Sequence, residues 1–146
     1  MKIIKANSSH ISIIAPLLDQ YRVFYKQISN ITAAEDFLEQ RMIKNESTIF
    51  LALENNVAIG FVQLYNSFST VSLKPIFILN DLYVHTDFRK QKIGEQLLSR
   101  AKEYCFKKGF KGLALETAID NPAQHLYERL GWKKETDCFH YFWTAN

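Results

Sequence analysis

The sequence has few of the features that mark secreted, membrane-spanning or metal-binding proteins. Only two of its 146 residues are cysteines, Cys105 and Cys138, so it contains no disulfide framework and a reducing, cytoplasmic setting is expected. The first ten residues hold too short an apolar run for a signal peptide, and no later run approaches the length of a membrane helix. The four histidines and two cysteines lack metal-ligand spacing, so we expect no metal.

Positive charge is scarce except in one place. Residues 1–79 carry seven Lys/Arg against six acids, whereas residues 89–111 carry eight against two, a local charge of +6 in a chain of net charge +3. No zinc-finger spacing or RNP motif accompanies this cluster. A patch this small suits a phosphorylated small ligand better than a nucleic acid, and no nucleic-acid or membrane partner is expected.

The length and the composition predict one globular domain over residues 1–146. Apolar residues make up 47% and aromatic residues 14% of the chain, which is typical of a packed core. The pattern predicts a strand, two helices, a hairpin turning at Asn55-Asn56, and a buried strand. The first strand is expected at 2–6, the first helix from Asn7 or Ser8, and the second helix from the Thr32-x-x-Glu35 capping box. The hairpin is expected at 47–65 and the buried strand at 75–84.

The second half predicts a helix that ends at Gly109, a strand, a short helix and two last strands. The strand is expected at 112–117, the short helix between Asn121 and Gly131, and the last strands at 132–143 around a connection at 135–137. The whole order is β-α-α-β-β-β-α-β-α-β-β. Such an order predicts an α/β fold around a mixed sheet.

The junction Val84–Gly94 joins the buried strand to the charged helix. The first N–H groups of a helix have no partner within it and its start is positive, so a pyrophosphate is a natural occupant. Arg89, Lys90 and Lys92 add to the positive potential. Close packing of the helix against the sheet would also explain Gly94.

Two segments resemble motifs of the GNAT superfamily of N-acetyltransferases. "DLYVHTDFRKQKIGEQLL" resembles its acetyl-CoA motif, Arg/Gln-x-x-Gly-x-Gly/Ala after a strand, with Arg89 first, Gly94 last and Lys92 in place of the middle glycine. "NPAQHLYERLGW" resembles the later motif around Tyr127, whose usual asparagine position is Asp120 here, with Asn121 one residue later.

The resemblance implies a mostly antiparallel sheet with helices on both faces and a splayed central strand pair that forms the acetyl-CoA cleft. It implies that the main chain of the strand binds the pantetheine arm, that the loop wraps the pyrophosphate, and that Tyr127 protonates the departing thiolate. The cofactor-binding residues expected on this basis are Leu82, Tyr83, Val84, Arg89, Lys90, Gln91, Lys92, Ile93, Gly94, Asn121 and Tyr127.

The general base and the acceptor pocket are less determined. Asp81 lies where the family often places an acidic residue and could draw a proton through water, or it could anchor a strand bulge. Glu116, on the neighbouring predicted strand, is a comparable candidate for the general base. Tyr21, Tyr25 and His140 are the expected acceptor-binding residues, because aromatic rings can hold an amine by cation–π contact.

The predicted activity is acetyl transfer from acetyl-CoA to a primary amine by direct attack on the thioester. A small-molecule amine is favoured over a protein, and the family resemblance is compatible with a homodimer. The alternative is a catalytically silent acyl-CoA-binding or regulatory module on the same fold. Lys92 and the Asp120/Asn121 offset favour that alternative, whereas Tyr127 favours the enzyme.

Overall fold

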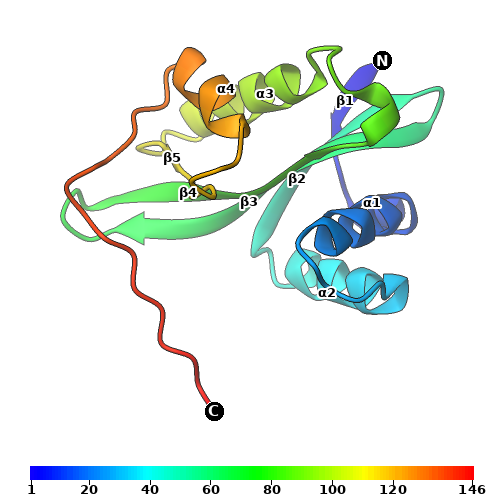
Figure 1. The fold of residues 1–146 in the computed structure, drawn as a ribbon, viewed down its shortest axis with the longest axis horizontal. Helices are drawn as coiled ribbons and strands as arrows, with labels where there is room; N and C mark the ends of the chain where they lie inside the picture. Colours follow the sequence, from blue (N-terminus) through cyan, green and yellow to red (C-terminus); the bar gives the residue numbers. More distant parts are fainter. The chain divides into compact units, whose positions relative to one another are not determined.

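A computed structural model describes all residues, 1–146, and divides the chain into two compact units, residues 1–116 and residues 117–146. The first unit is built on a five-stranded sheet in the order β1-β2-β3-β4-β5, antiparallel except for the β4–β5 pair (Figure 1). Its strands are β1 Lys2–Lys5, β2 Ser47–Glu54, β3 Val57–Ser69, β4 Lys74–Val84 and β5 Leu113–Ala114. The expected mixed α/β architecture is therefore confirmed.

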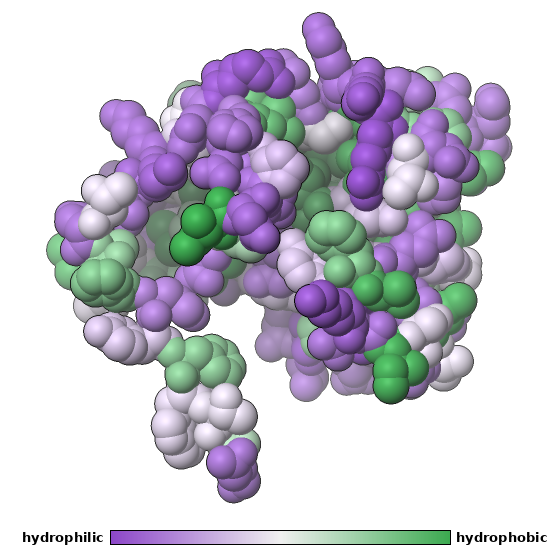
Figure 2. Space-filling model, viewed as in Figure 1, coloured by the Kyte–Doolittle hydropathy of each residue, from purple (hydrophilic) through white to green (hydrophobic).

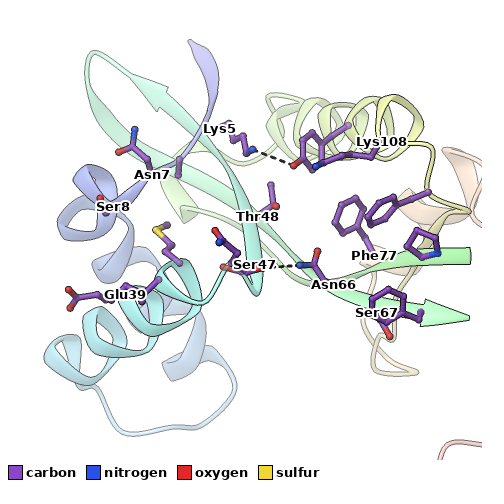
Figure 3. A pocket seen from close by; sticks show the side chains of 18 residues that line it. Lys5, Asn7, Ser8, Glu39, Ser47, Thr48, Asn66, Ser67, Phe77 and Lys108 are labelled. Atoms are coloured by element: carbon purple, nitrogen blue, oxygen red, sulfur yellow. Dashed lines mark hydrogen bonds between the residues drawn. The ribbon is translucent and has the colours of Figure 1, made fainter.

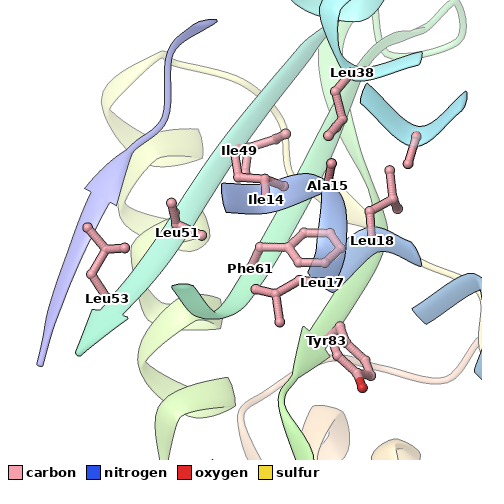
Figure 4. Packing of buried hydrophobic residues seen from close by; sticks show 11 residues of the cluster. Ile14, Ala15, Leu17, Leu18, Leu38, Ile49, Leu51, Leu53, Phe61 and Tyr83 are labelled. Atoms are coloured by element: carbon pink, nitrogen blue, oxygen red, sulfur yellow. The ribbon is translucent and has the colours of Figure 1, made fainter. Parts of the chain in front are cut away.

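Helices cover both faces of this sheet. α1 (Ile11–Phe24) and α2 (Ile31–Ile43) lie on one face and α3 (Ile93–Lys107) on the other, and two 3-10 turns, η1 (Ser8–His10) and η2 (Thr86–Phe88), precede α1 and α3 (Figure 1). Apolar side chains of α1 interlock with alternate residues of the central strands (Figure 4). That cluster comprises Ile14, Ala15, Leu17, Leu18, Ala34, Leu38, Ile49, Leu51, Leu53, Phe61 and Tyr83, none more than 8% exposed.

The burial of these side chains fixes α1 on the sheet. Removing one such aliphatic or aromatic side chain from water contributes about 1.5–3 kcal/mol. In contrast to this buried cluster, the surface on the face seen in Figure 2 is mainly hydrophilic. The position of α1 also places Tyr21, in its last turn, and Tyr25, its C-cap, which the sequence predicted as acceptor-binding residues.

Local signals set most element ends. Asn55 and Asn56 both take positive φ, 49° and 64°, at the β2–β3 turn, and Gly109 takes φ 71° after α3, as the sequence predicted. The predicted capping box at Thr32 is wrong, because α2 begins at Ile31 with Asn30 as its N-cap. The Asn30 side chain accepts a hydrogen bond from the Ala33 amide at 3.0 Å. The main-chain N–H of Asn30 donates to the buried Asp19 carboxylate at 2.6 Å.

The second unit contains one helix, α4 (Ala123–Arg129). The predicted start of this helix is wrong by one residue, because Pro122 is the N-cap and α4 begins at Ala123; Asn121, one residue before the cap, accepts from the Ala123 amide at 2.9 Å. Gly131 has φ 98° just beyond the helix, as predicted. The two last strands predicted at 132–143 are wrong: residues 132–146 contain no helix or strand. Aromatic residues give that segment a high strand propensity, but a strand exists only where a neighbour supplies a hydrogen-bonded ladder, and this segment has none.

None of the helices has the length and apolar character needed to cross a bilayer.

Candidate functional site

The edge of β4 that faces away from β3 is paired only at its start. β5 is two residues long rather than the predicted 112–117, and it bonds in parallel only to Phe77 and Ile78. From Leu79 to Val84 the strand has a partner in β3 and none on its other side. An unpaired edge can accept an extended ligand as an added strand. Leu82, Tyr83 and Val84, the predicted main-chain ligands, lie in this open stretch.

The open edge leads directly to the start of α3. Lys92 is the N-cap residue of α3, and its side chain makes no capping bond to the first N–H groups of this helix. Lys90 and Lys92 both adopt the left-handed conformation, with φ of 63° and 61°. Left-handed residues in a turn of this kind can direct neighbouring main-chain N–H groups toward one point, and such a concavity binds anions. Ile93, only 4% exposed, fixes the helix start in the core.

Arg89 joins this loop to the strand end. Its Nε donates to the Val84 carbonyl at 3.0 Å, and its guanidinium carbon lies 5.6 Å from the centre of the Tyr83 ring. The loop is thus held beside the open strand edge. The predicted group from Arg89 to Gly94 is brought together around one helix start, with Arg89, Lys90, Gln91 and Lys92 exposed to solvent.

Asp81 lies on the α1 face of the sheet because β4 contains a bulge. Gln63 pairs with Asp81 and Leu64 with Leu79, which leaves Asn80 as the extra residue. The Asp81 side chain is 7% exposed and accepts hydrogen bonds from Gln63 Nε2 at 2.7 Å and from Asn80 Nδ2 at 3.1 Å. The Tyr21 phenol is near enough to this carboxylate to lower its pKa. Asp81 is therefore a buried carboxylate held by two amide donors.

Burial dominates the electrostatics of this cluster. It raises the pKa of Asp81 above its usual value, and the hydrogen bonds from Gln63 and Asn80, together with the nearby Tyr21 phenol, oppose that rise. Burial and the nearby Asp81 charge raise the pKa of Tyr65 to about 12, against the opposing effect of Arg41. The same two causes raise the pKa of Tyr21 well above its usual value. Both phenols therefore stay protonated at neutral pH.

Gln63 links these groups and was not anticipated from the sequence. Its Nε2 also contacts the Tyr65 hydroxyl at 3.2 Å, whereas its Oε1 is buried without a hydrogen-bond partner. An orphaned buried acceptor costs about 1–3 kcal/mol. Only the pairing register, which places Gln63 opposite Asp81, gives these residues their roles, so a single strand pattern could not have identified them.

The predicted acceptor residue Tyr21 lies in the last turn of α1, and Tyr25, four residues later, is the C-cap of that helix. Their ring centres lie 5.0 Å apart in an edge-to-face arrangement, and Tyr21 also packs edge-to-face on Tyr83 at 5.9 Å. The Tyr83 hydroxyl donates to Gln20 Oε1 at 3.4 Å, which turns its side chain toward α1. The structure therefore brings Tyr21, Tyr25 and Asp81 together at one end of α1.

Three predicted site residues belong to the second unit. Tyr127 lies on α4, and its ring packs edge-to-face on Trp132 at 5.9 Å. Asn121 lies two residues before that helix and accepts from the Ala123 amide, and His140 lies in the segment without regular structure. Their roles at the site stay predictions.

A separate cavity of about 890 Å³ opens on the first unit (Figure 3). Its lining includes Ser47, Asn66, Phe77, Tyr104 and Lys108, and Lys5 Nζ donates to the Tyr104 hydroxyl at its wall over 3.3 Å. None of the predicted cofactor, catalytic or acceptor residues lines it. This cavity therefore does not identify the site described above.

Comparison with known proteins establishes the family. Residues 14–132 match the model of the acetyltransferase (GNAT) family. This chain belongs to the GNAT acetyltransferase family. It is 46% identical over 142 residues to an uncharacterized N-acetyltransferase of Bacillus subtilis, with 97% of this chain and 95% of that protein covered. The sequence resemblance to GNAT enzymes is thereby confirmed.

Two solved structures of this family are similar in fold. A crystal structure of a probable acetyltransferase is 36% identical, with a TM-score of 0.93 over 100% of this chain and 99% of that one. The aminoglycoside N-acetyltransferase AAC(6')-Iy, solved in complex with CoA, has a TM-score of 0.81 at 20% identity, with 99% of this chain and 95% of that one covered. The first supports an acetyltransferase assignment, and the second shows the fold alone.

Proposed function

We propose that this GNAT protein transfers an acetyl group from acetyl-CoA to the primary amine of a small molecule, by direct attack of the amine on the thioester. One observation carries the proposal: the unpaired edge of β4 from Leu79 to Val84 runs into the start of α3, where the N-cap side chain makes no capping bond and Arg89, Lys90 and Lys92 lie around the first turn. We further propose that residues 1–146 act as one GNAT domain in the cytoplasm.

The residues at this edge fit the two parts of acetyl-CoA. The main chain of Leu82, Tyr83 and Val84 would hold the extended pantetheine arm as an added strand. The amides from Gln91 to Gly94, at the positive end of α3, would hold the pyrophosphate. Asn121 of the second unit would hydrogen-bond to the pantetheine arm. The bound thioester supplies the acetyl group.

Two side chains would handle the protons. Asp81 would take a proton from the attacking amine, since its raised pKa makes it a stronger base than an exposed aspartate. Tyr127 would protonate the coenzyme A thiolate as the carbon–sulfur bond breaks. In the balanced step a nitrogen–carbon bond forms, the carbon–sulfur bond breaks, and the products are an amide and a free thiol.

The acceptor would lie against the aromatic rings of Tyr21 and Tyr25, with His140 of the second unit as a further contact. Aromatic faces attract an ammonium group before it loses its proton. This favours, as the acceptor, a small amine that carries an aliphatic or aromatic group. Few acidic side chains accompany these rings, so a polycation is not favoured.

Calorimetric titration with acetyl-CoA, free coenzyme A and ATP tests the first half of this proposal. Acetyl-CoA and free coenzyme A are expected to bind, and ATP is expected not to bind. Binding of all three with equal affinity would show that the loop recognises phosphate alone and would contradict the cofactor assignment.

Replacing Tyr127 by Phe tests the second half. The loss of a general acid is expected to lower turnover by a factor on the order of 10²–10⁴ while leaving acetyl-CoA affinity unchanged. Steady-state kinetics beside calorimetry separates the two effects. An equal loss of turnover and affinity would assign Tyr127 a structural role, and unchanged turnover would remove it from the mechanism.

A further inference from the structure

Gln63 is a polar side chain at a position where an apolar one would serve the fold better. It lies in the middle of β3, is 1% exposed, and leaves its Oε1 buried without a hydrogen-bond partner. Replacing a buried polar group and its partners by apolar groups of the same shape is often neutral or stabilising, so stability alone does not explain a glutamine here. A buried, half-satisfied amide of this kind calls for a functional explanation.

The orientation of the Gln63 amide is set by its two contacts. Its Nε2, which carries two hydrogens, lies 2.7 Å from Asp81 Oδ2 and 3.2 Å from the Tyr65 hydroxyl. The β3–β4 register places Gln63 directly opposite Asp81, so the main chain fixes the first contact. Rotating the amide by half a turn would bring its Oε1 against an ionised carboxylate oxygen, and two acceptors would then face each other. The observed orientation is therefore the one that an ionised Asp81 requires.

Gln63 is the better fixed of the two amides that hold Asp81. It donates to Oδ2, whereas Asn80 donates to Oδ1 over the longer distance of 3.1 Å and is the exposed residue of the bulge. A carboxylate offers about four acceptor sites, so each oxygen keeps room for an incoming proton. Asp81 is thus held on both oxygens without being closed to a proton.

The other charged and titratable groups near Asp81 do not change charge at neutral pH. Tyr21 of α1 lies near the carboxylate, and Tyr65 lies beside Gln63, with Arg41 of α2 acting on it. Both phenols keep their protons and arginine stays charged, so Asp81 is the group of this cluster whose charge can vary. Burial opposes its ionised form, and the Gln63 donor favours that form.

We propose that Gln63 is a positioning residue for Asp81: its amide holds the carboxylate in one orientation and favours the ionised form, which can accept a proton from the acceptor amine. The inference rests on the proposed function, in which Asp81 is the base. In the step that Gln63 assists, Asp81 takes a proton from the amine nitrogen as the nitrogen–carbon bond forms. The Gln63 amide keeps both of its hydrogens.

The direct test is the acid–base titration of Asp81 without any ligand. The full-length protein is labelled with ¹³C at aspartate carboxyls and followed by NMR, and Asp81→Asn identifies the Asp81 resonance. Gln63→Met keeps the length of the side chain and removes both amide donors. Losing a hydrogen bond to a buried carboxylate is expected to tighten proton binding at Asp81 on the order of 10- to 100-fold. Unchanged proton binding in folded Gln63→Met would overturn the proposal.

Two further variants control for indirect effects. Asn66→Leu removes another side-chain amide from β3, which donates to the Asn45 carbonyl at 2.9 Å, and should leave the titration of Asp81 unchanged. Gln63→Asn keeps a polar amide but withdraws it by one methylene, so it should also tighten proton binding, and it provides the test if the Met variant does not fold. Equal tightening in Asn66→Leu would show a general effect of disturbing β3 and would also overturn the proposal.

Turnover separates this inference from the proposed function. With acetyl-CoA and 2-phenylethylamine as the probe, Gln63→Met should lower kcat/KM most strongly at low pH, where Asp81 is protonated in the variant and ionised in the wild type. Dividing by the wild-type value at each pH cancels the ionisation of the amine, and this ratio should rise as pH increases. A ratio that stays the same at every pH would mean a merely structural role and would overturn the inference. Retained turnover in Asp81→Asn would instead contradict the proposed mechanism, while the titration would still decide whether Gln63 controls the charge of Asp81.

Discussion

Lys92 takes a backbone conformation that normally favours glycine. Its φ is 61° at the N-cap of α3, in the position where the family motif has its middle glycine. The left-handed conformation costs a side-chain-bearing residue roughly 1–2 kcal/mol. The departure from the motif therefore places a side-chain-bearing residue in a strained conformation.

Replacing Lys92 by Gly and by Ala separates conformation from charge. Both variants lose the same positive charge, but only Gly adopts φ near 61° without strain. We expect Lys92→Gly to be more stable than Lys92→Ala by about 1 kcal/mol in urea unfolding, with equal losses of acetyl-CoA affinity. Equal stability of the two would show that the loop relaxes out of the left-handed region.

Asp81 is expected to reduce stability in return for function. Its raised pKa means that the folded state binds a proton more readily than the unfolded chain, so stability falls as pH rises above the unfolded value of 3.8. Asp81→Asn removes this term, and it should be as stable as the wild type below pH 3.8 and at least as stable at pH 7, while losing turnover.

Thermal unfolding across this pH range gives the measurement, and Asp87→Asn is a matched control because Asp87 is exposed. A variant less stable than the wild type at pH 7 would mean that Asp81 serves the fold, as a bulge anchor, and not the reaction.

The sequence identified Asp81 but not its partners. A motif and strand alternation suffice to place an acid on β4. Gln63 lies 18 positions earlier and contacts Asp81 only through the β3–β4 register, and Tyr65, 16 positions earlier, contacts Gln63. The bulge at Asn80 sets that register, and nothing in the local sequence announces it. Pairing between strands is a property of the sheet and is not visible in one strand.

At the scale of elements, the junction between α1 and α2 depends on one buried acid. Asp19 accepts from the Ser29 hydroxyl at 2.5 Å and from the Asn30 amide at 2.6 Å, with Arg22 3.8 Å away. These hydrogen bonds, more than the Arg22 charge, hold the pKa of Asp19 below its usual value of 3.8. Asp19 thereby ties the N-cap of α2 to the helix that carries Tyr21.

Asp19→Asn is expected to cost about 1–3 kcal/mol at pH 7, because a charged acceptor with two donors becomes a neutral amide. Since the folded pKa is lowered, the stabilisation is present above pH 3.8 and disappears as pH falls through the folded pKa. Urea unfolding at pH 7 and below pH 3.8 should therefore show a gap between variant and wild type that narrows in acid. A gap of constant size would mean that the charge of Asp19 does not contribute.

Elements with strong local signals were predictable, and those defined by distant partners were not. The β2–β3 turn, the end of α3 at Gly109 and the ends of α4 each depend on residues within one turn of the boundary. The start of α2 was misplaced because Asn30 competes with Thr32 and is fixed by Asp19 from another helix. The strand predicted at 112–117 pairs with β4 over only two residues, and an edge of two residues gives the strands predicted at 132–143 almost nothing to pair with.

At the scale of the whole molecule, charge is separated along the chain. Residues 89–111 carry +6 in a protein of net charge +3, so the remaining residues sum to −3. Within the cluster the structure distinguishes two groups. Lys107 pairs with Glu103 at 2.7 Å, Lys108 lies over the Tyr104 ring and Lys111 bonds to Ser72, whereas Lys90 and Lys92 surround the start of α3.

This division predicts how acetyl-CoA affinity depends on salt. Exposed charges interact over a screening length of about 10 Å at 0.1 M salt and about 3 Å at 1 M, so affinity should fall steadily between these concentrations.

Replacing Lys90 and Lys92 by Gln should weaken binding and flatten that dependence, because the cations nearest the pyrophosphate are gone. Replacing Lys107, Lys108 and Lys111 by Gln removes more charge but should change affinity by less than about twofold, since these side chains serve the other end of α3. Calorimetry at several salt concentrations on the three proteins decides the matter. If the second set weakened binding as much as the first, the net charge of the chain would attract the ligand, and the loop from Arg89 to Gly94 would lose its special role.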